Sequence, residues 1–138
     1  MDEGFNQRVP PMRIFLAVAL ATIGLTVPVW ADEAADLSAA KSTIAAAKLS
    51  TASDLSMWCG AAMTLVSAAT KDSDADKSAA ADASAKNFFG KASESMTAEG
   101  VKSEDFAAIS GAYMALANAQ LVAQTEPPSH NTDDCVGN

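Results

Sequence analysis

The feature that most constrains this chain is an apolar run close to its start. Residues 14–29 carry no charge, follow a basic residue, and lead into the small residues Val29 and Ala31. A basic residue, a short apolar stretch and small residues at the minus-three and minus-one positions are typical of a cleaved secretory signal. We therefore predict that residues 1–31 are a signal peptide and that the mature protein begins at Asp32.

The alternative for the same run is an uncleaved membrane anchor. A spanning helix needs roughly 20 apolar residues and rarely fewer than about 17, whereas this run is shorter and contains Gly24 and Pro28. These properties favour cleavage. Residues 1–11 contain acids and prolines that signal peptides usually lack, so a start at Met12 is a second hypothesis. Export predicts a periplasmic protein in a Gram-negative bacterium and a secreted protein otherwise, with no membrane attachment after cleavage.

The predicted mature chain is acidic and rich in alanine. Its 107 residues, 32–138, suffice for one domain with a modest core. Fifteen acidic residues and seven lysines give it a net charge of −8, because two acids and both arginines belong to the predicted signal. The lack of arginine and the negative charge argue against binding to nucleic acid or to an anionic membrane. The scarcity of β-branched and aromatic residues favours helices over strands.

The apolar spacing predicts an all-α fold of four helices. These run over residues 32–49, over residues 54–71, from Ser73 to the segment 97–100, and from Ser103 to near Glu126. Ser73 is the expected N-cap of the third helix, and Gly100 is expected to adopt the left-handed conformation after it. Short connections make successive helices antiparallel, which predicts a small up-and-down four-helix bundle over residues 32–126.

Cys59 and Cys135 are the only cysteines. An even count in an oxidising compartment predicts one structural disulfide, rather than a redox-active or metal-binding pair. It would close a loop that stabilises the fold by about 4 kcal/mol in the chain-entropy model. Because the fourth helix ends far from Cys59, the tail 127–138 must double back, and the segment up to Cys135 spans up to about 30 Å. We expect this tail to be a covalently held strap.

Acidic residues and a histidine raise the question of a metal site. Asp72, Asp74 and Asp76 alternate like the start of a calcium loop, but Lys77 stands where such a loop needs glycine. Acids that open a helix explain the same pattern. His130, the only histidine, is expected to be an exposed residue of the tail. The sequence therefore predicts no metal and no cofactor.

Phe88 and Phe89 are the only residues that suggest contact with a ligand or partner. Adjacent helical positions point about 100° apart, so one ring sits at the centre of the core and the other is partly exposed. An exposed phenylalanine beside Gly90 would suit an apolar ligand or another protein. A wide buried face accounts for both rings as well, and the sequence favours that interpretation.

Three function classes follow from these observations. The first is an exported, non-enzymatic binding or stress-accessory protein that contacts another exported protein. The second is a carrier of a small apolar ligand, because small side chains leave space between helices. An enzyme ranks last, because no acid/base pair, Ser-His-Asp triad or metal set can be identified. A small exported chain with one disulfide and Trp58 beside Cys59 resembles periplasmic acid-stress chaperones, although its cysteines are further apart.

Overall fold

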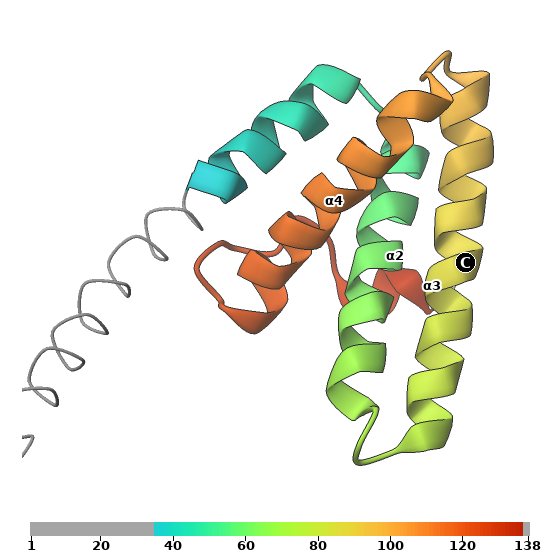
Figure 1. The fold of residues 1–138 in the computed structure, drawn as a ribbon, viewed down its shortest axis with the longest axis vertical. Coiled ribbons are helices and arrows are strands. Elements are labelled where there is room, and N and C mark those ends of the chain that lie inside the picture. The colour runs from blue at the N-terminus through green and yellow to red at the C-terminus, as the bar shows by residue number, and fades with distance from the viewer. Residues whose placement is uncertain (1–34, 137–138) are drawn as a thin grey trace, which may run out of the picture. The chain divides into compact units, whose positions relative to one another are not determined.

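A computed structural model of the protein describes residues 35–136. The predicted signal peptide, residues 1–31, lies outside this part of the chain. The described residues form four helices and no strand, which confirms the all-α prediction (Figure 1). The helices are a first helix over residues 35–47, α2 (Thr51–Thr70), α3 (Ala75–Ala98) and α4 (Phe106–Ala117). No helix within residues 35–136 is long and apolar enough to cross a membrane.

The second helix, α2, is the centre of the fold. Successive helices alternate in direction, and α2 packs against both α3 and α4 (Figure 1). The buried apolar cluster comes from these three helices and from one residue of the tail, Cys135. The first helix adds only half-buried side chains to this cluster, among them Ile44 and Ala47. The core is therefore that of a three-helix unit, with the first helix on its flank.

The α2 helix begins three residues earlier than the sequence suggested. Ser50 is its N-cap and accepts a hydrogen bond from the backbone N–H of Ser53 at 3.2 Å. Serine at this position satisfies one of the free N–H groups of the first turn. Residues 51–53 therefore belong to the helix and not to a linker, and Ser53 is fully buried.

The N-cap of α3 differs from the predicted residue, whereas the turn at its C-terminus is the predicted one. Asp74, not Ser73, accepts the capping hydrogen bond from the N–H of Lys77 at 3.0 Å. At the other end Gly100 adopts a φ of 87°, as predicted. The N–H of Val101 donates to Met96 O at 2.9 Å, which closes a Schellman turn.

The α4 helix ends earlier than expected, because a π turn follows it. This turn, Asn118–Val122, is closed by the N–H of Ala123, which donates to the carbonyl of Asn118 at 2.9 Å. Gln124 then adopts a φ of 54°, so the chain leaves the helix before Glu126. A π turn changes the direction of the side chains that it carries.

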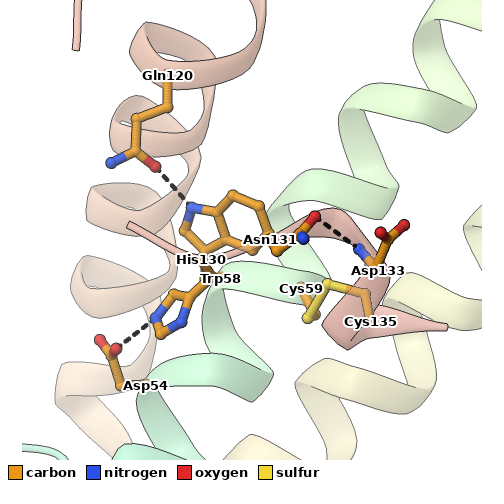
Figure 2. Close-up of a disulfide and its surroundings, with 8 residues drawn as sticks. All are labelled: Asp54, Trp58, Cys59, Gln120, His130, Asn131, Asp133 and Cys135. Carbon is orange, nitrogen blue, oxygen red and sulfur yellow. Dashed lines mark hydrogen bonds and ion pairs between the residues drawn. A yellow bond between two sulfur atoms is a disulfide. The ribbon is translucent and has the colours of Figure 1, made fainter. Parts of the chain in front are cut away.

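The tail doubles back, and the predicted disulfide is confirmed. The Cys59 and Cys135 sulfurs are 2.03 Å apart, and the Cα atoms of the two residues are 5.5 Å apart. A short 3-10 helix, Thr132–Cys135, carries the second cysteine to the middle of α2 (Figure 2). The tail thus covers a side of the core, over α2, that no helix covers.

Candidate functional site

The two phenylalanines nominated as contact residues both pack into the protein. Phe88 is 4% exposed and belongs to the buried cluster. Phe89 is half-buried and packs against the same cluster from its edge. A Cβ atom at Gly60 would lie 2.8 Å from the Phe89 ring, so the glycine allows α2 and α3 to approach closely there. The arrangement matches the wide buried face and offers no exposed aromatic ring.

An open cavity of about 520 Å³ lies between the first helix, the α3–α4 turn and α4. Small or apolar side chains make up half of its lining: Ala46, Ala47, Val101, Ala108 and Ile109. Drug-sized ligands bind in pockets of about 300 to 1,000 Å³ with mainly apolar walls and a few polar groups. The cavity is therefore large enough for a small molecule. Alanine side chains leave this space because they do not reach the neighbouring helix.

Polar groups stand at one end of this cavity, where Glu99, Lys102 and Asp105 line it. The Lys102 ammonium lies 3.8 Å from the carboxylate of Glu104. Both side chains of this pair are largely exposed, so the pair contributes little to stability. The cavity thus joins an apolar wall to a charged rim.

Glu99 completes the cap of α2 from another helix. In a capping box, a glutamate at the third helical position accepts a hydrogen bond from the N-cap N–H. Here that position is Ser53, and Glu99 of α3 accepts the N–H of Ser50 instead, at 3.1 Å. The carboxylate lies at the C-terminus of its own helix, where the dipole disfavours it, but at the N-terminus of α2, where the dipole favours it.

Three serine hydroxyls surround the same carboxylate. Ser50 and Ser53 donate to Glu99 Oε1 at 2.5 and 2.6 Å, and Ser95 donates at 3.1 Å. We call these four residues the Glu99 cluster. The hydrogen bonds from Ser50 and Ser53 are the main reason that the pKa of Glu99 falls from 4.5 to about 2. The cluster joins the start of α2 to the end of α3.

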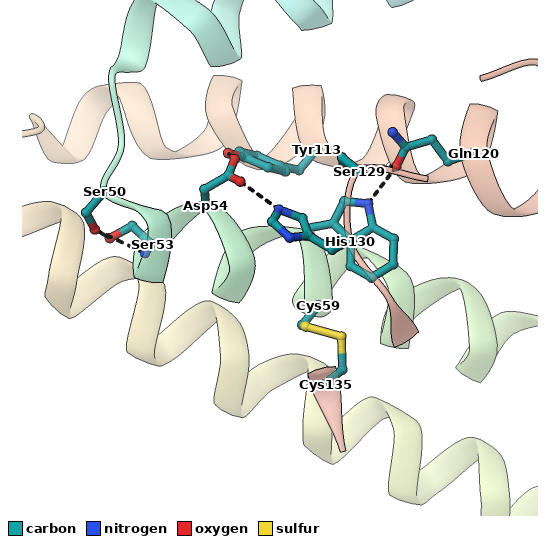
Figure 3. Close-up of polar contacts among 10 residues, drawn as sticks. Ser50, Ser53, Asp54, Cys59, Tyr113, Gln120, Ser129, His130 and Cys135 are labelled. Atoms are coloured by element: carbon teal, nitrogen blue, oxygen red, sulfur yellow. Dashed lines mark hydrogen bonds and ion pairs between the residues drawn. A yellow bond between two sulfur atoms is a disulfide. The ribbon is translucent and has the colours of Figure 1, made fainter. Parts of the chain in front are cut away.

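One residue after this cluster, Asp54 joins α2 to α4 and to the tail (Figure 3). The Tyr113 hydroxyl of α4 donates a short hydrogen bond to Asp54 Oδ1. The His130 Nε2 atom of the tail lies 2.6 Å from Asp54 Oδ2. Burial, together with the bond to Asp54, raises the pKa of Tyr113 above its ordinary range. Two neighbouring residues of α2 therefore bind different parts of the protein: Ser53 contacts the end of α3, and Asp54 contacts α4 and the tail.

The expectation that His130 is an exposed tail residue is wrong. Its side chain is 17% exposed, and its ring centroid lies 5.6 Å from that of Trp58. Trp58 is fully buried, and its Nε1 donates a hydrogen bond to Gln120 Oε1 at 2.7 Å (Figure 2). Gln120 belongs to the π turn, which directs its side chain inward. The reason for the difference is the disulfide, which draws the tail across α2 and places the histidine on the tryptophan.

Few side chains of the tail hold it in place. Residues 127–134 are exposed except for His130, and Cys135 is the buried anchor. The polar contacts of the tail with the helices include His130 Nε2, which lies 2.6 Å from Asp54 Oδ2, and Ser129 Oγ, which donates to Gln120 at 3.3 Å. Ordering one residue costs about 1 to 2 kcal/mol, while a hydrogen bond contributes about 0.5 to 1.5 kcal/mol. A nine-residue segment in which only His130 and Cys135 are shielded from solvent therefore depends on its covalent bond.

The acidic residues and the histidine of the described part of the chain are not gathered into a cluster. Within residues 35–136, no three His, Cys, Asp or Glu side chains lie close enough to hold a metal ion together. Asp74 caps α3, where its Oδ1 accepts the N–H of Lys77. The resemblance of residues 72–76 to such a loop is explained by the start of a helix.

The chain matches no family model, no curated protein and no solved structure. Its function has to be inferred from the site itself. The cavity beside α4 and the Glu99 cluster escaped sequence reasoning, because both join residues about fifty positions apart. Only one local signal pointed to Glu99. Ser50 is a typical N-cap, but the position where a capping box has glutamate is occupied by Ser53, so the acidic partner has to come from elsewhere in the chain.

Proposed function

We propose that the protein is an exported, non-enzymatic binding protein whose ligand is a small apolar molecule. The observation that supports this is the cavity of about 520 Å³ between the first helix and α4. Its volume lies in the range typical of ligand pockets, and its alanines leave an apolar wall. Two of these wall residues, Ala46 and Ala47, come from the first helix, so that helix serves as one side of the site.

Filling the cavity should weaken binding of an apolar ligand. Ala108→Trp introduces an indole at a lining position of α4, whereas Ala107→Trp adds the same group at the preceding exposed position, outside the lining. With the neutral apolar probe N-phenyl-1-naphthylamine, we expect Ala108→Trp to weaken binding at least about tenfold, the effect of losing one good apolar contact. Fluorescence titration measures this.

The neighbouring variant is the control for folding and surface effects. Ala107→Trp should bind the probe within about twofold of the natural chain, because a single exposed substitution changes little. Equal binding by both variants would show that the probe does not use this cavity. Native mass spectrometry of protein from its own source would then identify any molecule carried elsewhere.

Export is part of the same proposal. The apolar run 14–29 and the Val29-Trp30-Ala31 end support cleavage after Ala31. N-terminal sequencing of the exported protein should begin at Asp32. A membrane-bound form that begins at Met1 or Met12 would contradict cleavage. The disulfide is in keeping with an oxidising compartment, since such bonds are rare in the cytosol.

We further propose that the first helix completes an up-and-down four-helix bundle. Ile44, Ala47 and Leu49 pack against the core, and Lys41 forms an ion pair with Glu126 at 2.7 Å. These contacts support a bundle in which the first helix is the most loosely held member. Such an arrangement suits a binding site between this helix and α4, because entry of a ligand needs only a small displacement.

An acid-stress role is the second candidate function. Glu99 supports it, because the serine hydrogen bonds keep this carboxylate charged below its ordinary pKa of 4.5, so its contribution to joining α2 and α3 declines only gradually as the pH falls toward about 2. A protein exposed to acid benefits from contacts that persist when other carboxylates are neutral. Its partner would be another exported protein.

A further inference from the structure

We propose that residues 127–135, which we call the strap, form a redox-controlled cover on α2. Reduction of the Cys59–Cys135 disulfide releases the strap and uncovers Trp58, while α2, α3 and α4 stay packed. This inference concerns the region beyond the C-terminal end of α4, whereas the proposed ligand cavity lies near its N-terminal end, and it does not depend on that proposal.

The first support is the way in which the strap is attached. Cys135, the covalent anchor, is 6% exposed, whereas the other strap residues are exposed, apart from the half-buried His130. Val136, which follows the anchor, is 83% exposed and adds no apolar contact. With so little buried surface, the order of the segment depends on the disulfide rather than on packing.

The second support is the space along the strap. A shallow cavity of about 580 Å³ is bounded by Leu121 of the π turn and by strap residues between Pro128 and Asp134. The strap therefore leaves open space beside the π turn instead of packing closely against it. His130 contacts the Trp58 ring from the strap, so departure of the strap removes a cover from a fully buried tryptophan (Figure 2).

The third support is that the helices have contacts of their own. Trp58 donates to Gln120, and Tyr113 donates to Asp54, so each bond joins two helical segments directly. The strap contacts the same two acceptors, through Ser129 at Gln120 and through His130 at Asp54. The Glu99 cluster joins α2 to α3 at the far end of the helix pair. Because these hydrogen bonds have both partners in helical segments, we expect them to remain when the strap leaves.

The chemical step is ordinary thiol–disulfide exchange with a dithiol. One thiolate of the dithiol attacks Sγ of Cys135, the less buried of the two residues, and Cys59 leaves as a thiolate. The second thiol of the reagent then attacks its own sulfur in the mixed disulfide and releases Cys135. The protein gains two electrons and two protons as two thiols, and the reagent becomes a disulfide.

Quenching of Trp58 fluorescence tests the proposal. In the full chain carrying Trp30→Phe, Trp58 is the only tryptophan. After treatment with dithiothreitol, we expect the acrylamide quenching constant to rise about threefold, while the helical circular dichroism is unchanged, as in a local opening. Loss of the helical signal together with the rise would overturn the proposal, and so would unchanged quenching when both thiols have been titrated.

Two variants separate the disulfide from the polar contacts. Cys135→Ser should show the high quenching constant without any reductant and should not respond to it. Ser129→Ala removes a polar contact to Gln120 but keeps the disulfide, so its quenching should equal that of the parent chain. High quenching in oxidised Ser129→Ala would show that polar contacts hold the strap. If Cys135→Ser does not fold, that result also contradicts an independent helical core.

Discussion

Phe88→Ala is expected to lower the free energy of unfolding by about 3 to 5 kcal/mol, the range for removing a buried phenylalanine. The ring is 4% exposed and lies in the cluster that also holds Ala92 and Met96. Much of this core is alanine, which is too short to move into the space that the ring vacates. The cavity should therefore stay open and the cost should lie toward the upper end. Urea unfolding at 25 °C measures it.

Phe89→Ala is the matched comparison on the next residue of α3. Its ring is half-buried, so we expect a loss of about 1 to 2 kcal/mol, less than for the neighbouring ring. Part of this loss comes from the gap left above Gly60, which the ring covers. If the Phe89→Ala chain is as stable as the natural one but no longer binds its ligand, then Phe89 is a contact residue after all.

Local patterns were enough to predict the helices and the disulfide. The three-and-four spacing places α2 and α3 within three residues of their observed starts, because helix formation depends on neighbouring residues. The disulfide followed from the cysteine count together with the predicted export. The left-handed Gly100 followed from its place after a helix.

The contacts that distinguish this protein could not be predicted in the same way. His130 looked like a solvated tail residue, because nothing in the tail itself indicates that it lies on Trp58. The π turn that directs Gln120 inward has no sequence signal, since the residues around it suit an ordinary helix. Such contacts depend on the path of the chain after α4, which the disulfide determines.

Glu99→Gln is expected to lower the melting temperature at pH 7 and to have progressively less effect in acid. The folded-state pKa of about 2 lies below the ordinary value of 4.5, so the unfolded chain takes up a proton first as the pH falls. The contribution of the charged group is therefore complete above a pH of about 4.5 and disappears as the pH approaches about 2. Thermal unfolding at several pH values measures the difference between the two chains.

Glu94→Gln provides the control, because it removes the same charge from an exposed position of the same helix. Its melting temperature should follow that of the natural chain across the whole pH range, whereas the gap for Glu99→Gln should close between pH 4.5 and 2. The charged groups that line the cavity with Glu99 are Lys102 and Asp105, so a Lys102→Gln chain should keep the same pH dependence if the serines are responsible. A gap that stays constant with pH would show that Glu99 acts through its shape and not through its charge.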